Sequence, residues 1–367
     1  MSALRVRLLP AAEIDSARAA WAGLELSPHD GGLVCGWDWT HTWLQAYGDV
    51  VPYRFAIAER GDAVVGAALV TSSRATGAKG FGIRRLHLGT AGEPEGEGVF
   101  VEYNGVLTAT GELEAFAEAL IAAIDDEPGW DELRVDGLSA DQARAFAAAA
   151  PALELGFEAS PYTDLDTIRA AGGDVLAALE KGPRSRIRRG MRGFGELQGE
   201  WAETETQAVE IFEELVRLHQ AQWQAAGEPG AFGVARVLGF HRELIPTLVP
   251  GGRVMLFRVR AGERTVGCLY GLLDGGRLLF YQSGFGVFED AKLKPGLVTH
   301  ALCMQACLER GLSAYDFLAG EARYKRELAT GEAQLAWGRL SRPRVRPRLA
   351  AAARWLARRP QPLTPFG

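Results

Sequence analysis

The sequence predicts an α/β (α+β) protein of two successive domains, each a mixed but mostly antiparallel sheet flanked by helices. A chain of 367 residues is longer than one hydrophobic core usually serves. Amphipathic helices and strands follow one another in the same order in both halves. One β-hairpin of the first half can also be aligned with one of the second. Together these observations favour a duplicated domain.

The N-terminal half opens with a strand, a helix and a second helix rich in tryptophan. In that second helix Trp39, Trp43 and Tyr47 recur at helical spacing, and Gly48 suits its end. A hairpin, a short strand, an amphipathic helix, a strand and a last helix follow. The expected strands are 5–9, 53–58, 63–71, 106–107 and 131–135, and the expected helices are 11–24, 35–48, 113–124 and 141–150.

The C-terminal half repeats this order. One apolar stripe predicts a helix over 208–218, and a second stripe predicts a helix that begins at Pro295 and ends before Gly311. A hairpin and a third strand lie between the two helices, and a short strand closes the half. The expected strands are 253–258, 265–272, 276–281 and 314–318.

The strongest sign of duplication is a pair of matching hairpins. Residues 59–69 and 260–270 agree in the position of the turn, in a Val-Gly step and in the phase of the strand. The alternative is that any α/β protein repeats hairpins and helices. We expect a duplication, with an N-terminal domain, a basic linker and helix, a C-terminal domain and a basic tail at 1–165, 166–203, 204–340 and 341–367.

Composition narrows the class of protein. Hydrophobic residues make up 47% and charged residues 23%, which is typical of a globular protein. The net charge of -6 gives no general preference for nucleic acid. The four cysteines form no CxxC pair, and neither a signal peptide nor a run of ~20 apolar residues is present. We therefore expect a cytoplasmic protein, and its richness in Ala, Gly and Arg is typical of bacteria.

Four short motifs of the second half carry a resemblance to a known family. They are Phe-Tyr-Gln-Ser-Gly at 280–284, Lys-Pro-Gly-Leu at 294–297, Tyr-Asp-Phe-Leu-Ala-Gly at 315–320 and Tyr-Lys at 324–325. In this order they resemble the tandem GNAT N-acetyltransferases of the CelD-like type and, more distantly, the Fem peptidyl ligases. The resemblance extends to about Leu340. It implies two tandem GNAT-like domains that move an acyl group, in the first place acetyl, from acyl-CoA to an amine such as an amino sugar or another envelope or polysaccharide precursor.

The start of the helix at 295 is the expected cofactor site. A helix N-terminus offers free N–H groups and partial positive charge, glycine allows a phosphate to approach, and lysine adds charge. The alternative is a plain loop with solvated lysines. The usual GNAT phosphate pattern, Arg/Gln-x-x-Gly-x-Gly/Ala, is kept here only at its central glycine. The residues expected to bind acetyl-CoA are Lys292, Lys294, Gly296, Leu297 and Val298.

The first half has no version of this motif, so we expect it to be structural or to bind the acceptor. Trp39 and Trp43 are its candidates for substrate binding. In the second half, Lys325 follows a glycine-containing loop and is a candidate to hold an anionic group of a substrate or cofactor.

Acyl transfer to an amine needs a base for the ammonium and an acid for the leaving thiolate. Asp316 and Glu321 are the candidate bases, and Tyr281 and Tyr324 are the candidate acids. The alternatives are a structural hydrogen bond for Asp316 and a place in the core for Tyr281. A metal is not expected, because His300, Cys303 and Cys307 share a helix face without a further cluster of ligands nearby.

Two basic segments interrupt the acidic chain. Residues 181–192 carry six Lys or Arg and no acid, and residues 339–359 are similarly basic. Such a run is commonly a solvated face, but it also suits a polyanion such as tRNA. The tail also suits an amphipathic helix at a membrane surface. These features leave two alternatives to an acyl-CoA enzyme, namely a Fem-like ligase that uses aminoacyl-tRNA and a catalytically silent GNAT-fold binding protein.

Overall fold

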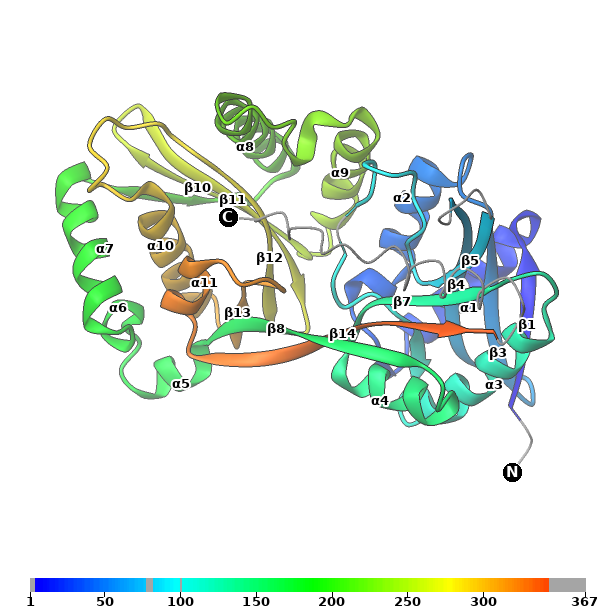
Figure 1. Cartoon of the computed structure of the whole chain (residues 1–367). Helices are drawn as coiled ribbons and strands as arrows, with labels where there is room; N and C mark the ends of the chain where they lie inside the picture. The colour runs from blue at the N-terminus through cyan, green and yellow to red at the C-terminus, as the bar shows by residue number, and fades with distance from the viewer. Residues whose placement is uncertain (1–3, 77–81, 100, 343–367) are drawn as a thin grey trace, which may run out of the picture. The chain divides into compact units, whose positions relative to one another are not determined.

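The structure, a computed structural model, describes residues 4–76, 82–99 and 101–342 (Figure 1). It comprises two compact units. The N-terminal unit consists of Met1–Glu158 and Gln334–Gly367, and the C-terminal unit consists of Ala159–Ala333. The expected linker at 166–203 is therefore part of the C-terminal unit, and the chain returns to the N-terminal unit at its end. From residue 343 on, the expected basic tail lies outside the described residues.

Both units contain the same nine elements in the same order, strand-helix-helix-strand-strand-strand-helix-strand-helix. In the N-terminal unit these are β1 (Leu4–Pro10), α1 (Ile14–Glu25), α2 (Trp37–Tyr47), β3 (Tyr53–Arg60), β4 (Ala63–Thr76), β5 (Gly82–Leu88), α3 (Leu113–Asp126), β7 (Glu132–Ser139) and α4 (Ala140–Ala149). In the C-terminal unit they are β9 (Gln198–Trp201), α8 (Glu205–Ala225), α9 (Ala235–Leu248), β10 (Val254–Ala261), β11 (Arg264–Asp274), β12 (Arg277–Phe285), α10 (Pro295–Glu309), β13 (Ala314–Asp316) and α11 (Arg323–Leu328). This order confirms the predicted fold class.

A few elements have no counterpart in the other unit. The N-terminal unit adds a small ribbon of β2 (His29–Asp30) and β6 (Leu107–Ala109). The C-terminal unit adds α5 (Leu165–Ala170), α6 (Val175–Ala178) and α7 (Lys181–Phe194) before β9. None of the helices in the described ranges is long and apolar enough to span a bilayer.

Each unit ends its sheet with a strand taken from a distant part of the chain. The order in the N-terminal unit is β1-β3-β4-β5-β7-β14, where β14 (Gly331–Ser341) pairs with β7. The order in the C-terminal unit is β9-β10-β11-β12-β13-β8, where the end of β8 (Glu154–Asp164) pairs with β13. In both units one central pair is parallel, β5 with β7 and β12 with β13, and the other neighbouring pairs are antiparallel. Thus β8, which follows the N-terminal elements in the chain, ends the C-terminal sheet, and β14, which follows the C-terminal elements, ends the N-terminal sheet.

The Val-Gly step shared by the two hairpins has a packing role. A Cβ atom on Gly66 would lie 2.5 Å from the Phe116 ring of α3. A Cβ atom on Gly267 would lie 2.6 Å from the Phe285 ring of β12. In each unit, therefore, the glycine makes room for an aromatic ring on its strand.

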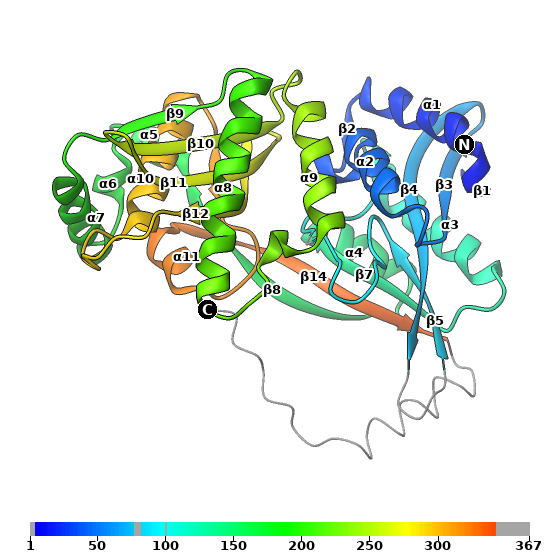
Figure 2. The ribbon, with the colours of Figure 1, turned by 90° about the horizontal axis from the view of Figure 1, so that it is seen from above.

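Helices cover both faces of the C-terminal sheet, with α8 over one face of β11 and β12 and α10 over the other (Figure 2). The apolar stripe predicted for α10 is buried there with Tyr315 and Phe317. In the N-terminal unit the predicted stripe of α3 is buried with Trp130 and Phe146. The cores thus follow the predicted helical faces.

Candidate functional site

The C-terminal unit contains an opening between two parallel strands. The register of β12 with β13 covers only Arg277–Leu279 against Ala314–Asp316. β12 continues to Phe285, whereas β13 ends at Asp316. Over the second half of β12, one edge of the strand is therefore left without a ladder partner among the described strands. An unpaired strand edge can offer backbone N–H and C=O groups to a ligand. At Ser283 these groups already have partners, since the N–H donates to Gln282 Oε1 at 3.0 Å and the carbonyl oxygen lies 2.9 Å from His219 Nδ1.

A β-bulge marks the start of this open edge. On β11 and β12, Tyr270 pairs with Gln282 and Gly271 pairs with Phe280, so Tyr281 is the extra residue. Bulges commonly lie beside active sites, where they redirect a side chain. The Tyr281 ring turns toward α9, and it lies 4.8 Å from the ring of His241. Tyr281 is half-buried, and its ring packs against the buried rings of His241 and Tyr270.

The start of α10 lies at the far end of the open edge. A Cβ atom on Gly296 would come within 3.3 Å of the Phe285 ring, at the end of β12. Lys294 is the N-cap with a φ of 49°, Pro295 follows it, and no side chain caps the helix. The first N–H groups of a helix have no acceptor within it, and this applies to Gly296 and Leu297. Lys292 and Lys294 are exposed beside them.

Val298 does not fit the cofactor role predicted for it. Its side chain is fully buried, and its N–H donates to the carbonyl oxygen of Lys294 at 3.1 Å. The first turn of the helix has closed by this residue. In the first turn of α10 the N–H groups of Gly296 and Leu297 thus precede the first closed turn, and Lys292 and Lys294 lie just before them.

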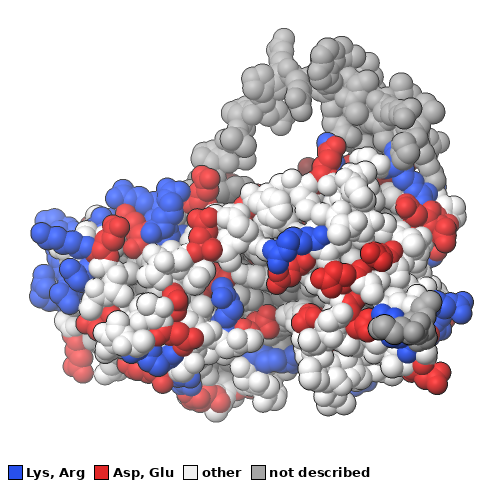
Figure 3. Space-filling view, turned by 90° about the horizontal axis from the view of Figure 1, so that it is seen from below, with Lys and Arg blue, Asp and Glu red and all other residues white. Residues whose placement is uncertain are grey.

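Helix α7 holds this helix start in place. A Cβ atom on Gly190 would lie 2.3 Å from the carbonyl oxygen of Leu293, so the two backbones are in close contact. On the buried side of α7, Pro183 and Ile187 face the core. The exposed side carries Lys181, Arg188, Arg189 and Arg192. Figure 3 shows Lys and Arg gathered at the end of the C-terminal unit where α7 lies in Figure 1. The basic run is thus a packed helix rather than a linker.

An aromatic and imidazole cluster lies behind the opening on the α10 side. The ring of Tyr324 stacks on His300 at 5.2 Å, and the Tyr315 hydroxyl lies 2.8 Å from His300 Nδ1. Burial and the nearby Lys325 ammonium together lower the pKa of His300 to about 3, so the imidazole is neutral. Burial also raises the pKa of Tyr324, which keeps its phenol protonated. His300 and Tyr324 are therefore both in their neutral forms.

Asp316 lies in a buried network rather than in the opening. It is 0% exposed. Its carboxylate accepts hydrogen bonds from Ser160 Oγ at 2.7 Å, from the backbone N–H of Leu318 at 2.8 Å and from Arg277 Nη2 at 2.8 Å. Leu318 has a φ of 60°, which is strained for a β-carbon-bearing residue. Asp316 thus fixes the strained backbone at Leu318.

Lys325 holds the same loop from its other side. Its ammonium donates to the carbonyl oxygens of Leu318 at 3.2 Å and of Ala319 at 2.6 Å. These bonds occupy the side chain that was predicted to hold an anionic substrate. Glu321, in contrast, is exposed on the loop that Asp316 and Lys325 fix.

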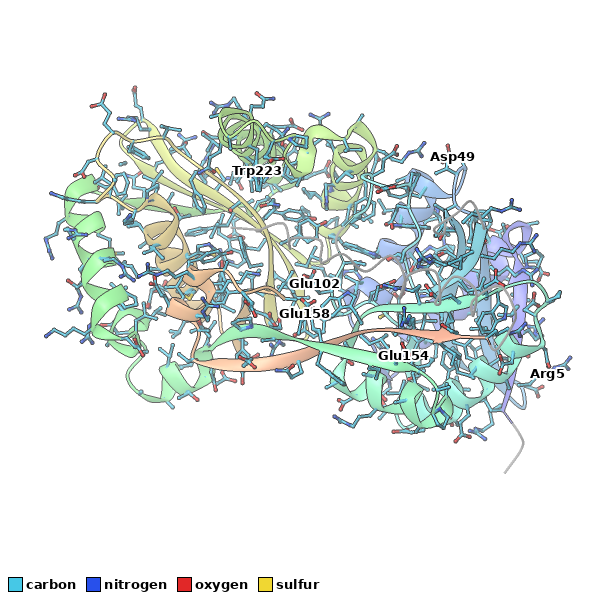
Figure 4. The ribbon with its side chains drawn as sticks, in the orientation of Figure 1. Arg5, Asp49, Glu102, Glu154, Glu158 and Trp223 are labelled. Carbon is cyan, nitrogen blue, oxygen red and sulfur yellow. The ribbon has the colours of Figure 1, made fainter. Side chains whose placement is uncertain are left out.

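Two histidines near the bulge were not predicted from the sequence. Nδ1 of His219 lies 2.9 Å from the Ser283 carbonyl oxygen, and its Nε2 accepts from the N–H of Ala231 at 3.2 Å. Burial lowers the pKa of His241 to about 3, so this imidazole is also neutral. Trp223 on α8, labelled in Figure 4, extends the cluster with its ring 5.8 Å from that of His219. The sequence predicted the helix over 208–218, which ends just before His219, but it did not predict α9, which carries His241.

The face of α10 that carries His300, Cys303 and Cys307 was not expected to bind a metal, and all three side chains are buried. Burial raises the pKa of the Cys303 thiol well above its usual range. In the described ranges no group of three or more His, Cys, Asp and Glu is arranged to hold a metal ion. The helix face of His300, Cys303 and Cys307 belongs to the core.

In the N-terminal unit, Trp39 and Trp43 lie behind the wall of a cleft. They are 1% and 0% exposed. The indole N–H of Trp39 donates to Thr90 Oγ1 at 2.9 Å, and that of Trp43 donates to Glu93 Oε1 at 2.8 Å. Thr90 and Glu93 line a cleft of about 1410 Å³. The two tryptophans therefore position a loop that faces the cleft and do not face it themselves.

One protein family model matches part of the C-terminal unit. Residues 181–326 match the model of the acetyltransferase (GNAT) domain. No curated protein matches the sequence well enough to count as a relative.

Several solved structures share the fold of the whole chain. FemX matches with a TM-score of 0.55 and 12% identity over 88% of this chain and 95% of its own. The C-terminal domain of a protein assigned as a lysylphosphatidylglycerol synthetase, from Agrobacterium fabrum, matches with a TM-score of 0.54 and 12% identity over 93% and 94%. L-PGS from Bacillus licheniformis matches with a TM-score of 0.53 and 10% identity over 93% and 96%. At such low identities the similarity concerns the fold alone.

Proposed function

We propose that the C-terminal unit is an N-acyltransferase that moves an acyl group, in the first place acetyl, from acyl-CoA to an amine. The acceptor we propose is an amino sugar or a related envelope or polysaccharide precursor, and the reaction takes place in the cytoplasm. The observation that carries this proposal is the opening between β12 and β13, which has an uncapped helix start at its end. The GNAT domain match supports the reaction class.

The residues of the opening suit the parts of an acyl-CoA molecule. A pyrophosphate would accept hydrogen bonds from the N–H groups of Gly296 and Leu297, with Lys292 and Lys294 neutralising its charge. The amides of a pantetheine arm would pair with the open edge of β12, as an added strand does. The departure is the loss of the outer positions of the usual phosphate motif, for which the two lysines compensate.

The chemistry needs one proton taken and one proton given. Burial keeps the phenol of Tyr324 protonated, and this phenol is the acid that we propose for the leaving thiolate. Glu321 is the remaining candidate base, acting on the ammonium directly or through a water. Asp316 and Lys325 act as positioning residues, since their hydrogen bonds fix the loop that carries Glu321. Tyr281 positions the bulge rather than moving a proton.

A second candidate donor is aminoacyl-tRNA, as in a Fem-like ligase. The observation that favours it is the exposed basic face of α7, which packs beside the start of α10. FemX also shares the fold. A tRNA donor would contact many phosphates, so its binding would weaken steeply with added salt.

One experiment separates these functions. Purified protein is mixed with acetyl-CoA and a set of amino sugars, and the released CoA thiol is followed. The same protein is heated with and without acetyl-CoA, because a ligand that binds the native state raises the melting temperature. Thiol release and a raised melting temperature support the acyl-CoA enzyme.

The two other outcomes are also informative. No response to any acyl-CoA, combined with salt-sensitive tRNA binding, would replace this function by the Fem-like one. Binding of acetyl-CoA without thiol release from any amine would favour a silent binding protein.

A further inference from the structure

The N-terminal sheet carries a row of polar side chains across three adjacent strands. Ser73 is on β4, His87 on β5 and Asp136 on β7. The register pairs Ser73 with Arg85 and His87 with Arg134. Since side chains alternate along a strand, Ser73, His87 and Asp136 all project from the same face. The fold therefore places a serine, a histidine and an aspartate side by side.

The distances follow the order of a proton relay. Ser73 Oγ lies 2.8 Å from His87 Nε2, and His87 Nδ1 lies 3.5 Å from Asp136 Oδ2. If Nε2 accepts the serine proton, the ring proton sits on Nδ1 and faces the aspartate. The second distance is longer than a hydrogen bond, and within the described chain His87 Nδ1 has no other partner. Such contacts often shorten only when substrate binds.

The His87 imidazole is fixed by the residues packed around it. His87 is only 9% exposed. The loop after β5 covers it, since a Cβ atom on Gly92 would lie 3.0 Å from His87 Cδ2. That loop is tied down by the Thr71 hydroxyl, which donates to the Ala91 carbonyl oxygen at 2.6 Å, and by the two indole bonds to Thr90 and Glu93. A buried nitrogen without a partner is costly, which favours a functional reason for it.

The aspartate is directed toward the histidine by a bulge. On β7 and β14, Leu138 pairs with Ala336 and Asp136 pairs with Trp337, so Gly137 is the extra residue. Gly137 has a φ of 77°, which favours glycine. Arg134 Nη2 lies 3.6 Å from Asp136 Oδ1, so a cation supports the carboxylate. The bulge and the ion pair together fix the third member of the row.

All three residues line the cleft of the N-terminal unit. Its volume of about 1410 Å³ is larger than most small-molecule sites, which measure about 300–1,000 Å³. The side chains of the row are thus accessible to a substrate of moderate size. Its walls also include Arg85, Glu93 and Trp337, which offer both charged and aromatic contacts.

We propose that the N-terminal unit holds a second active site, in which His87 activates Ser73 as a nucleophile toward a small ester or thioester. Ser73 Oγ forms a bond to the carbonyl carbon of the substrate, and its proton moves to His87 Nε2. The bond to the leaving alcohol or thiol then breaks, and the leaving atom takes that proton. Water attacks the acyl-serine, gives a proton to His87, and releases the carboxylic acid as Ser73 regains its proton. The net reaction is hydrolysis.

The test uses the full-length protein and a fluorescent fluorophosphonate, which reacts with activated serines. One adduct should form, and peptide mass spectrometry should place it on Ser73. Ser73→Ala and His87→Gln should remove the label, and Asp136→Asn should slow labelling about ten-fold or more. Ser72→Ala is the matched control, because Ser72 points to the other face of β4 and should label normally.

Two further readouts keep the test decisive. Melting curves of each variant show whether lost labelling reflects lost folding. Ser73→Ala removes only the hydroxyl group, so we expect it to affect stability least. p-Nitrophenyl acetate should give a burst of one nitrophenolate per chain, absent in Ser73→Ala. Absence of any adduct, or an adduct that persists in Ser73→Ala, would overturn the proposal. Labelling should be unchanged in Lys292→Glu/Lys294→Glu, because this site does not depend on the acyl-CoA site.

Discussion

Helices α3 and α10 occupy corresponding positions in the two units, and the side chains at their starts have opposite charges. In the N-terminal unit α3 begins after Glu112, which forms a two-bond ion pair with Arg60 at 3.0 and 2.6 Å, and Glu114 lies in its first turn. In the C-terminal unit α10 begins after Lys294, with no acid in its first turn. A carboxylate satisfies the positive end of a helix and repels a phosphate, whereas a lysine leaves it open to one.

This difference shows that two units with the same order of elements present different polar groups at corresponding places. The N-terminal unit has acidic side chains at its helix start and a polar row on its sheet. The other keeps the helix start open and places neutral histidines and tyrosines in its core. The helix start thus differs between the two units, whereas the packing of a strand glycine against an aromatic ring, Gly66 on Phe116 and Gly267 on Phe285, is the same in both.

The largest expected effect concerns the buried carboxylate of the C-terminal unit. Asp316→Ala removes the carboxylate that accepts hydrogen bonds from Arg277 and from the Leu318 N–H. Removing one member of a buried ion pair costs about 3–5 kcal/mol, and we expect the lower end of this range because the Arg277 side chain is 33% exposed. Urea unfolding should show a loss of this size in the C-terminal unit. Unchanged stability together with lost turnover would instead make Asp316 the catalytic base.

The next effect concerns the helix start itself. Lys292→Glu/Lys294→Glu should weaken acetyl-CoA binding at least about 100-fold, because each of the two lost charge-assisted contacts is worth about 1.5–3 kcal/mol. Isothermal titration calorimetry measures the affinity. The matched control is Arg18→Glu, a charge reversal at an exposed position of α1, which should bind normally. Equal weakening in the control would point to general electrostatics rather than to α10.

The paired glycines sharpen the comparison. Gly66→Ala and Gly267→Ala both bring a Cβ atom against an aromatic ring and should each cost about 2 kcal/mol of stability. Only Gly267→Ala displaces Phe285, against which Gly296 packs, so only this variant should also weaken acetyl-CoA binding. Denaturant unfolding and calorimetry on both variants give the answer. Equal effects on binding would mean that the Phe285 contact does not shape the site.

The smallest effect concerns pH. Burial lowers the pKa of His241 from 6.5 to about 3, so the unfolded chain takes up a proton below pH 6.5 that the native state refuses. Stability from this group is present above pH 6.5 and is lost progressively as the pH falls toward 3. At pH 5.5 the loss is about 1.4 kcal/mol. His241→Phe should flatten this part of the stability profile. A profile unchanged by the substitution would show that His241 titrates normally.

The sequence predicted the elements whose pattern is local. The stripes of α3 and α10 and the two aligned hairpins were all visible because apolar spacing and turn residues lie close together in the chain. The open start of α10 was likewise visible in Lys294, Pro295 and Gly296. By contrast, β5 and α9 were missed. β5 alternates Arg85 and His87 with apolar residues over only a few positions, and α9 contains a proline at 246.

The partners of the site residues could not be read from the sequence. Asp316 is bonded to Ser160, which lies 156 positions away, and the exchange of β8 and β14 is equally non-local. The serine, histidine and aspartate of the N-terminal unit come from three strands, one of which was not predicted. Only the register of those strands brings them together.

The most direct test of the contrast between the two helix starts is a calorimetric titration of the full chain with CoA. We predict a single site per chain, which disappears in Lys292→Glu/Lys294→Glu and remains in Glu112→Gln. Two equal sites per chain, or one site that survives reversal of both lysines, would contradict the assignment of the phosphate-binding role to α10 alone.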